Sequence, residues 1–230
     1  GGNNGAIVSD KADIDIALRG VVFGSLATAG QRCTTTRRVI VNEKIYDDFL
    51  QKLVHAYSTI KVGDPRNNGV LVGPLIDEGA VSTFEKAVEE AVKEGGKIAY
   101  GGKRLPIKSL EKGHYVMPTI IEADPSMKIV KEETFAPIIY VMKYRTIEEA
   151  LEIHNNVPQG LSSSIFTTDL REEEAFLSPY GSDCGLANVN TKTGDRLFHS
   201  LRTLNSIFKF YNFFLKFIFH HFSINGHPEN

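Results

Sequence analysis

The residue in this sequence best suited to covalent chemistry is Cys33, which lies in the segment Gly30-Gln31-Arg32-Cys33-Thr34. The thiolate form of cysteine is the nucleophile, and nearby cations favour that form. Arg32 adjoins Cys33, and Arg37 and Arg38 follow a few residues later. Free cysteines are also common as small buried side chains. The residue types alone therefore leave a reactive thiol and a structural thiol as open alternatives.

The other residues that could do chemistry are less well placed. Cys184 has no His, Asp or Glu near it at metal-ligand spacing, so we interpret it as a structural residue. His220, His221 and His227 match no known metal-binding pattern, and we expect no metal site. The sequence also lacks a Gly-x-Gly-x-x-Gly segment and a Gly-Lys-Ser/Thr phosphate loop.

The elements that must position Cys33 follow from hydrophobic periodicity. Apolar residues at helical spacing predict helices over 13–29, 45–60, 78–94, 146–155 and 170–177, and short apolar runs predict strands over 38–41, 97–100, 115–121, 138–144, 161–166 and 185–190. Helices that alternate with strands are typical of an α/β fold with a mostly parallel sheet flanked by helices. Cys33 falls between a helix and a strand, where functional residues often collect.

Several predicted helices carry sequence signals at their ends. Asp10 or Asp13 is suited to cap the first helix, and Gly30 is suited to end it. Gly95-Gly96 ends the helix over 78–94. Thr146-Ile147-Glu148-Glu149 fits a capping box, in which a Thr hydroxyl and a Glu carboxylate satisfy backbone N–H groups of the first turn.

Composition narrows the class of protein. The chain has 230 residues, of which 42% are hydrophobic and 23% charged, values typical of a soluble globular protein. A formal net charge of −2 gives no reason to expect nucleic acid or an anionic membrane as a partner. Two cysteines are too few for a disulfide framework.

The last forty residues differ from the rest, which predicts a division at residue 190. From Phe198 onward lie eight of the 14 Phe residues, and residues 191–230 hold five Lys or Arg against two Asp or Glu. Lys209 and Lys216 interrupt the apolar stretch Leu201–Phe222, which makes a membrane-spanning helix a poor interpretation and a basic interfacial helix a better one. We favour a third interpretation. The residue types of this segment are those of A/T-rich codons, so the Phe-rich tail is expected to have no evolved role.

Five sequence blocks occur in the order and at the spacing of a known enzyme family. They are Gly1-Gly2-Asn3-Asn4, Gly30-Gln31-Arg32-Cys33-Thr34, Glu132-Glu133-Thr134-Phe135-Ala136-Pro137, Gly160-Leu161-Ser162-Ser163-Ser164-Ile165-Phe166, and Gly181-Ser182-Asp183-Cys184-Gly185 with Asn188-Val189-Asn190. Over about residues 1–190 the chain resembles the aldehyde dehydrogenase superfamily. It looks most like the antiquitin subfamily of α-aminoadipic semialdehyde dehydrogenases. Five ordered blocks are far more specific than one short motif.

The resemblance implies a cofactor, a reaction and roles for particular residues. It implies NAD as the cofactor and Cys33 as a nucleophile that attacks an aldehyde carbon to give a thiohemiacetal and then a thioester. Glu133 would hold the nicotinamide ribose hydroxyls, because a carboxylate accepts from two hydroxyl donors. Phe135 would form an apolar wall beside the nicotinamide, and Gly2 would lie in the cofactor site. Glu133 could instead be a solvated surface charge.

Arg32 would grip a carboxylate on the substrate, since a planar guanidinium suits bidentate binding. A plain surface arginine, or an arginine in a structural ion pair, is an equally open interpretation of Arg32. The implied partners are a small aldehyde and further copies of the chain in a homotetramer. The expected compartment is the cytoplasm, with the mitochondrion as a second possibility.

The sequence also departs from the family pattern. The family's general-base Glu would lie two residues before Gly1, and the dinucleotide-binding domain with its oxyanion-binding Asn is not among these residues. After Asn190 the sequence no longer follows the family's Gly-rich substrate loop. We therefore expect a truncated catalytic domain that is inactive alone, or a non-catalytic remnant or interaction module. A cysteine hydrolase using His55 or His114 is a third and weaker hypothesis, because neither His lies in a recognisable motif.

Overall fold

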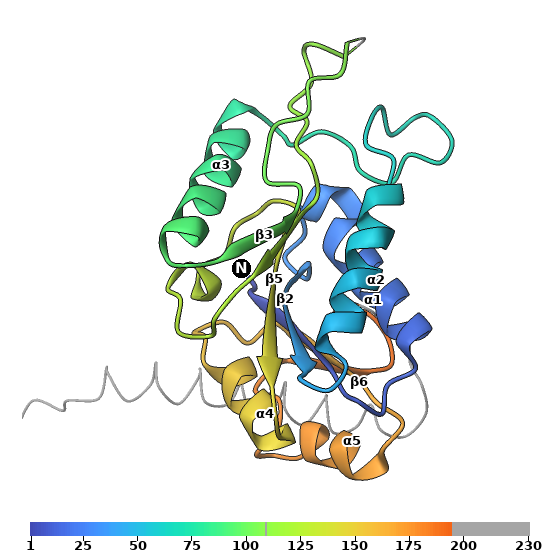
Figure 1. Cartoon of the computed structure of the whole chain (residues 1–230), viewed down its shortest axis with the longest axis vertical. Helices are drawn as coiled ribbons and strands as arrows, with labels where there is room; N and C mark the ends of the chain where they lie inside the picture. The colour runs from blue at the N-terminus through green and yellow to red at the C-terminus, as the bar shows by residue number, and fades with distance from the viewer. Residues whose placement is uncertain (109, 195–230) are drawn as a thin grey trace, which may run out of the picture.

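The fold is a seven-stranded sheet with helices on both faces, seen in a computed structural model that describes residues 1–108 and 110–194 (Figure 1). The strand order is β3-β4-β5-β2-β1-β6-β7. Every neighbouring pair is parallel except β3 and β4, which are antiparallel. The predicted α/β class with a mostly parallel sheet is confirmed.

The helices and strands have the following bounds in chain order. They are β1 (Asn4–Val8), α1 (Ile14–Leu26), the 3-10 turn η1 (Ala27–Gly30), β2 (Thr36–Asn42), α2 (Tyr46–Thr59), α3 (Glu78–Lys93), β3 (Lys97–Tyr100), β4 (Thr119–Glu122), the 3-10 turn η2 (Ile129–Lys131), β5 (Ile138–Tyr144), α4 (Ile147–Asn155), β6 (Ser162–Phe166), α5 (Leu170–Leu177) and β7 (Leu186–Val189).

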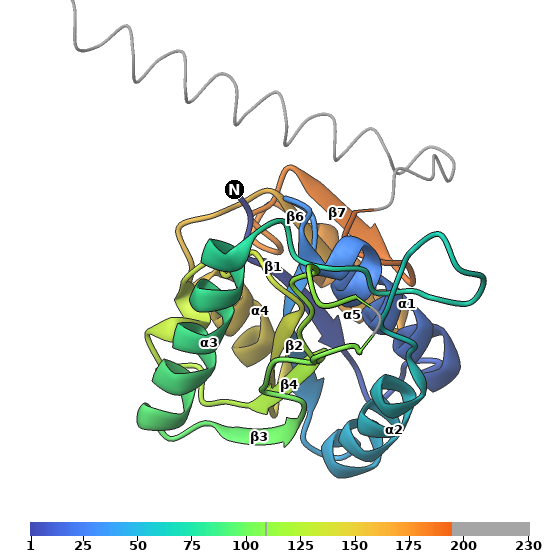
Figure 2. The same cartoon turned by 90° about the horizontal axis from the view of Figure 1, so that it is seen from above.

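The core lies between the sheet and its two helical layers. Helices α1 and α2 pack side by side on one face, while α4 lies against β1, β2 and β5 on the other face with α5 beside it (Figures 1 and 2). All residues of β1, β2 and β6 are buried. Strands covered on both faces need not alternate apolar and polar residues, which explains why Ser162, Ser163 and Ser164 are buried in β6.

Local sequence signals correctly predicted the starts of α1 and α4 and the end of α3. The Asp13 side chain accepts from the Ile16 N–H at the start of α1. Thr146 accepts from the Glu149 N–H at the start of α4, and the Glu149 carboxylate accepts from the Arg145 N–H. At the end of α3, Gly95 has a φ of 99°, a left-handed conformation that glycine adopts without a steric penalty.

Most predicted bounds lie within two residues of the observed ones, and three parts of the chain differ more from the sequence prediction. Residues 4–8 form β1, for which no element was predicted. The predicted strand 115–121 is ordered as β4 only from Thr119, which follows Pro118. The predicted helix 13–29 ends at Leu26, because Thr28 and Ala29 adopt φ values of 56° and 54°.

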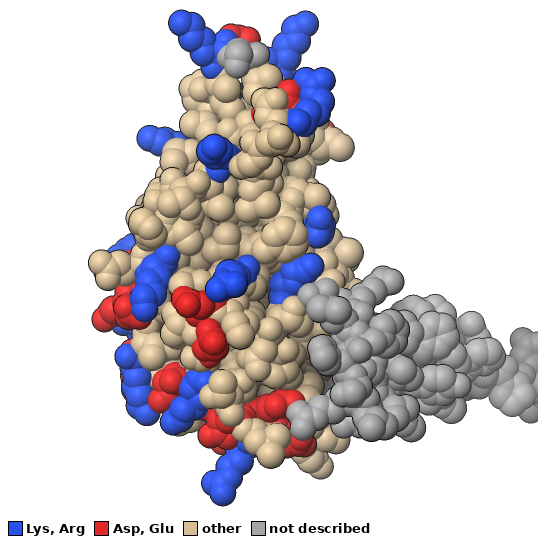
Figure 3. All heavy atoms as spheres, turned by 90° about the vertical axis from the view of Figure 1, so that its right-hand side faces the viewer, with Lys and Arg blue, Asp and Glu red and all other residues tan. Residues whose placement is uncertain are grey.

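The described part of the chain ends at residue 194, so the Phe-rich stretch Leu201–Phe222 lies outside it. The division at residue 190 stays a prediction. Within the described residues no helix is long and apolar enough to cross a membrane, and no group of three His, Cys, Asp or Glu side chains could hold a metal ion. On the face drawn in Figure 3, acidic and basic side chains intermingle over the lower part of the molecule.

Candidate functional site

Cys33 lies in the short connection between η1 and β2, with its backbone held and its side chain exposed. The Asn4 side-chain amide donates to the Cys33 carbonyl oxygen at 2.8 Å and to the Thr35 carbonyl oxygen at 2.7 Å. A Cβ added to Gly2 would lie 2.3 Å from the Cys33 carbonyl oxygen, so only glycine fits there. The thiol is therefore presented to solvent from a backbone that is fixed in place.

The backbone around Cys33 is held on both sides. The Arg32 N–H donates to the Thr35 hydroxyl at 3.1 Å, and the Thr35 N–H donates to the Arg32 carbonyl. On the other side, the Thr193 hydroxyl donates to the Thr34 carbonyl at 2.7 Å. In the described part of the chain no acceptor pairs with the Cys33 backbone N–H, which leaves this donor available to a ligand.

Glu133 lies beside the Cys33 segment, although 100 residues separate the two in sequence. One of its carboxylate oxygens accepts from the Gly2 N–H at 3.0 Å and from the Arg37 guanidinium at 3.3 Å. A Cβ on Gly1 would lie 1.8 Å from the other carboxylate oxygen. The Glu133 side chain keeps 22% of its surface exposed, so the carboxylate can still accept from hydroxyl groups of a ligand.

Arg37 is the centre of this arrangement. Its side chain is 2% exposed and donates to the carbonyl oxygens of Gly2, Gly30 and Arg32 at 3.1, 3.2 and 3.1 Å. Burial lowers the pKa of the Arg37 guanidinium below its usual value, and the negative charge of Glu133 opposes that shift. One buried cation thus ties the N-terminal segment, the Cys33 segment and Glu133 together.

Phe135 covers the outer side of Arg37. The guanidinium carbon lies 5.1 Å from the centre of the Phe135 ring, within the range of a cation–π contact. The Phe135 residue is 45% exposed. An exposed ring held by a buried cation offers a flat apolar surface next to the Glu133 carboxylate.

Arg32 is exposed and adjoins Cys33. Among the described residues its guanidinium takes part in no ion pair and no side-chain hydrogen bond, so a structural ion pair does not account for it. Its predicted role in binding a substrate carboxylate remains a prediction.

These residues converge because they precede three neighbouring parallel strands. Gly2 precedes β1, Cys33 precedes β2, and Glu133 and Phe135 precede β5. The amino ends of parallel strands meet at one edge of the sheet. At that edge, a Cβ on Gly30 would lie 2.3 Å from the Ala136 carbonyl oxygen, so the Cys33 and Glu133 segments pack backbone against backbone.

The structure brings together Cys33, Glu133, Phe135, Gly2 and Arg32, which the sequence singled out. Sequence reasoning missed the roles of Asn4, Arg37 and Thr193 in holding them. Two sequence signals could have indicated the roles of Arg37 and Asn4: a pair of arginines at the start of a buried strand, and a pair of asparagines directly after two glycines. No such signal marks Thr193.

Cys184 has the environment of a structural residue. Its sulfur lies 3.7 Å from the His154 Nε2, in a cluster with Ser182 and Ser163. Burial raises the pKa of the Cys184 thiol. A raised pKa disfavours the thiolate, which makes Cys184 a poor nucleophile at neutral pH.

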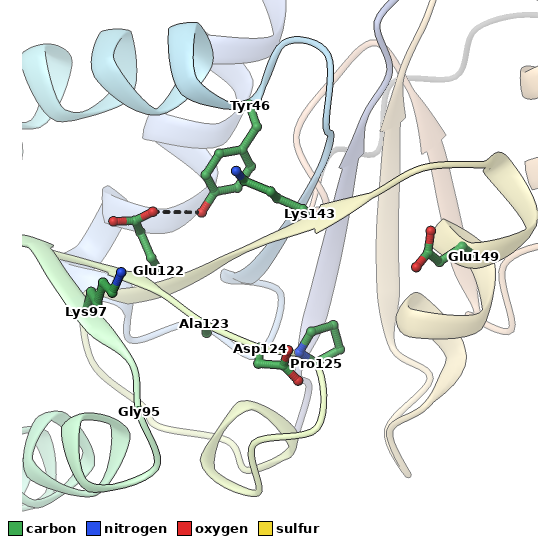
Figure 4. A pocket seen from close by; sticks show the side chains of 9 residues that line it. All are labelled: Tyr46, Gly95, Lys97, Glu122, Ala123, Asp124, Pro125, Lys143 and Glu149. Carbon is green, nitrogen blue, oxygen red and sulfur yellow. Dashed lines mark hydrogen bonds between the residues drawn. The ribbon is translucent and has the colours of Figure 1, made fainter.

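A separate cavity of about 390 Å³ lies at the opposite edge of the sheet (Figure 4). It is lined by charged side chains near the carboxyl ends of β4 and β5, among them Glu122, Asp124 and Lys143, and by Tyr46. The Tyr46 hydroxyl donates to Glu122 at 3.4 Å. No residue of the Cys33 site lines this cavity, so it has no part in the chemistry of Cys33.

The family model described as "Aldehyde dehydrogenase family" matches residues 1–199. A putative aldehyde dehydrogenase family 7 member A1 homolog from Dictyostelium discoideum is 48% identical over 193 residues, which are 84% of this chain and 37% of that protein. The α-aminoadipic semialdehyde dehydrogenase of Rattus norvegicus is 49% identical over 194 residues, again 84% of this chain and 35% of that protein. The chain thus spans little more than a third of the length of these relatives.

Solved structures of two aldehyde dehydrogenases share the fold of this chain. Betaine aldehyde dehydrogenase from Staphylococcus aureus, in complex with NAD+, superposes with a TM-score of 0.81 at 31% identity, over 85% of this chain and 39% of that one. Lactaldehyde dehydrogenase from Escherichia coli gives a TM-score of 0.79 at 34% identity, over 86% of this chain and 40% of that one. These matches confirm the resemblance predicted from the five sequence blocks.

Proposed function

Because this chain belongs to the aldehyde dehydrogenase family, we propose that it supplies the nucleophile and part of the NAD site for oxidation of an aldehyde to a carboxylic acid. One observation carries the proposal. The exposed thiol of Cys33 lies on a backbone fixed next to Glu133, through hydrogen bonds that share Gly2 and Arg37. The edge of the sheet formed by the amino ends of β1, β2 and β5 therefore holds a candidate nucleophile and a candidate cofactor ligand.

The residues at this edge fit an NAD nicotinamide riboside. Glu133 offers a partly exposed carboxylate for ribose hydroxyls, Phe135 offers an exposed ring for the nicotinamide, and the close approach of Gly1 and Gly2 keeps the space beside Glu133 free of side chains. NAD, when bound, supplies the hydride acceptor for the oxidation. The relative from Staphylococcus aureus, whose structure is in complex with NAD+, supports this assignment.

The chemistry assigned to Cys33 is nucleophilic. The thiolate sulfur forms a bond to the aldehyde carbon, the carbonyl π electrons move to oxygen, and a thiohemiacetal oxyanion results. The Cys33 backbone N–H is unpaired among the described residues and can donate to that oxyanion. Loss of hydride from the carbon gives a thioester, and water then releases the acid and regenerates the thiol.

We assign Arg32 to the substrate. An exposed guanidinium next to the nucleophile suits an aldehyde that also bears a carboxylate, that is, a semialdehyde. The name of the relative from Rattus norvegicus, α-aminoadipic semialdehyde dehydrogenase, supports this substrate class. A homo-oligomer, a homotetramer by the family resemblance, and a cytoplasmic or mitochondrial compartment belong to the same proposal.

A chimera tests the proposal. Residues 1–190 of this chain replace the matching segment of the Rattus norvegicus enzyme, and aldehyde-dependent NADH formation is measured with α-aminoadipic semialdehyde. We expect turnover in the chimera and its loss in the Cys33→Ser variant, with NAD binding retained in both. For the 230 residues alone we expect no NADH formation. A chimera that folds and binds NAD but does not turn over would refute the proposal.

A further inference from the structure

Gln31 makes an unusual set of contacts two residues before Cys33. Its side-chain oxygen accepts from the Ile76 N–H at 2.9 Å, and its side-chain nitrogen donates to the Pro74 carbonyl oxygen at 3.3 Å. The side-chain amide of Gln31 thus donates one hydrogen bond to the backbone of the 74–76 loop and accepts one from it. Among the described residues, no other side chain of the Cys33 segment forms a hydrogen bond with that loop.

Gln31 also forms hydrogen bonds to a strained backbone segment that directly precedes it. Thr28, Ala29 and Gly30 have consecutive φ values of 56°, 54° and 72°. Left-handed conformations are unfavourable for residues with a Cβ, above all for a β-branched one, and persist only where the surroundings enforce them. The Thr28 carbonyl oxygen accepts from both the backbone N–H and the side-chain nitrogen of Gln31, each at 3.1 Å.

The partner loop is itself anchored. The Leu75 N–H donates to the His114 carbonyl at 2.8 Å, and Leu75 is buried at 2% exposure. Asp77, the next residue but one, caps α3 by accepting from the Ala80 N–H at 2.7 Å. A bond from Gln31 to this loop therefore ties the strained segment to a part of the molecule that is already fixed.

We propose that Gln31 is a positioning residue for Cys33: its side-chain amide locks the left-handed segment 28–30 against the 74–76 loop and so fixes the direction from which the thiol is presented. This inference rests on the proposed function, because it matters only if Cys33 is the nucleophile. Without the amide, the 28–30 segment keeps the Arg37 bond to the Gly30 carbonyl but loses its hydrogen bonds to the 74–76 loop. Cys33, three residues after Gly30, is then held less firmly.

The test uses the full chain and three variants. Gln31→Met keeps the size of the side chain and removes both hydrogen-bonding groups. Gln31→Glu keeps an acceptor for the Ile76 N–H and removes the donor. Gln51→Met is the matched control, since Gln51 is exposed on α2 and its side chain forms no hydrogen bond with any described residue. Two quantities are measured: hydrogen exchange at the Ile76 amide, and the rate of Cys33 alkylation by iodoacetamide from pH 6 to pH 9.

We expect Gln31→Met to speed exchange at Ile76 by about tenfold or more and to slow Cys33 alkylation several-fold across that pH range. Gln31→Glu should restore slow exchange at Ile76, and Gln51→Met should change neither quantity. Unchanged Ile76 exchange in Gln31→Met would overturn the inference. Faster exchange at Ile76 in Gln31→Met with an unchanged rate of Cys33 alkylation would also overturn the inference. This second result would leave the proposed function intact. A wild-type Cys33 that reacts no faster than Cys184 would count against the proposed function as well, and this result needs no variant.

Discussion

Replacement of Arg37 by Met tests whether a single buried cation holds the Cys33 site together. Methionine fills much of the space of arginine with an apolar, flexible side chain, so the variant removes charge and hydrogen bonds more than volume. Arg37 donates to the carbonyl oxygens of Gly2, Gly30 and Arg32 and pairs with Glu133. Each of these groups loses a partner in the variant.

The expected decrease in the free energy of unfolding follows from the groups that lose Arg37 as a hydrogen-bond donor. The Arg32 carbonyl still accepts from the Thr35 N–H, so its loss is small. Within residues 1–108 and 110–194 the Gly2 and Gly30 carbonyls accept from no other donor, and an unsatisfied buried acceptor costs about 1–3 kcal/mol. Glu133 is partly exposed and regains water, so its contribution is small. We expect the free energy of unfolding to fall by about 3 kcal/mol, at the low end of the range for breaking a buried ion pair.

Urea denaturation of the full chain, followed by far-ultraviolet circular dichroism, measures this change. With a slope of about 3 kcal/mol per molar urea, a loss of ~3 kcal/mol moves the midpoint down by about 1 M. Arg66→Met is the control, because Arg66 is 87% exposed and pairs with Asp64 at the surface. Its midpoint should not change measurably. An Arg37→Met midpoint equal to that of the control would refute the role assigned to Arg37.

Three further predictions concern single residues. Gly30→Ala should lower the free energy of unfolding by at least about 2 kcal/mol in the same urea assay, because φ is 72° and the new Cβ would lie 2.3 Å from the Ala136 carbonyl oxygen; a neutral effect would contradict the close packing. Burial raises the pKa of the Cys184 thiol above its usual value of 9.0. The unfolded chain therefore loses this proton first, and stability should fall as pH rises past 9.0. Cys184→Ala should remove the loss of stability at alkaline pH that this thiol causes. Identical slopes of the urea midpoint against pH in the wild-type and Cys184→Ala proteins would contradict this prediction. Asp77→Ala removes the cap of α3 and should cost about 1 kcal/mol, whereas no shift in the urea midpoint would mean that the cap contributes nothing.

The helices and the starts of α1 and α4 were predictable because their signals are local, whereas the end of α1 was not. Asp13 and Thr146 cap helices through hydrogen bonds that span three residues. Strand β5 was predicted with its correct bounds, since Ile138–Tyr144 is an apolar run preceded by a proline. These features depend on near neighbours in sequence and on side-chain chemistry alone.

Strand β1 was missed for a physical reason. Its five residues, Asn4–Val8, begin with Asn and Gly, which are rare in strands. The strand forms because β2 and β6 flank it on both sides, and that pairing comes from distant parts of the chain. The Asn4 side chain is also satisfied there, through the carbonyls of Cys33 and Thr35.

The geometry of the site was likewise beyond the sequence alone. Residue types and the family resemblance singled out Cys33 and Glu133, but the bond that links Glu133 to Gly2 spans 131 residues. The role of Arg37 depends on three carbonyl groups whose positions only the folded sheet determines. Thr193 holds the Thr34 carbonyl from beyond the boundary that composition had suggested at residue 190.

The claim that Cys33 is the nucleophile is tested most directly by trapping its covalent intermediate. The chimera with the Rattus norvegicus enzyme is mixed with α-aminoadipic semialdehyde and NAD, quenched in acid, digested and analysed by peptide mass spectrometry. We predict an acyl adduct on the peptide that contains Cys33, and no adduct on the peptide that contains Cys184. An active chimera whose adduct forms at another residue, or whose Cys33→Ser variant still turns over, would contradict the claim.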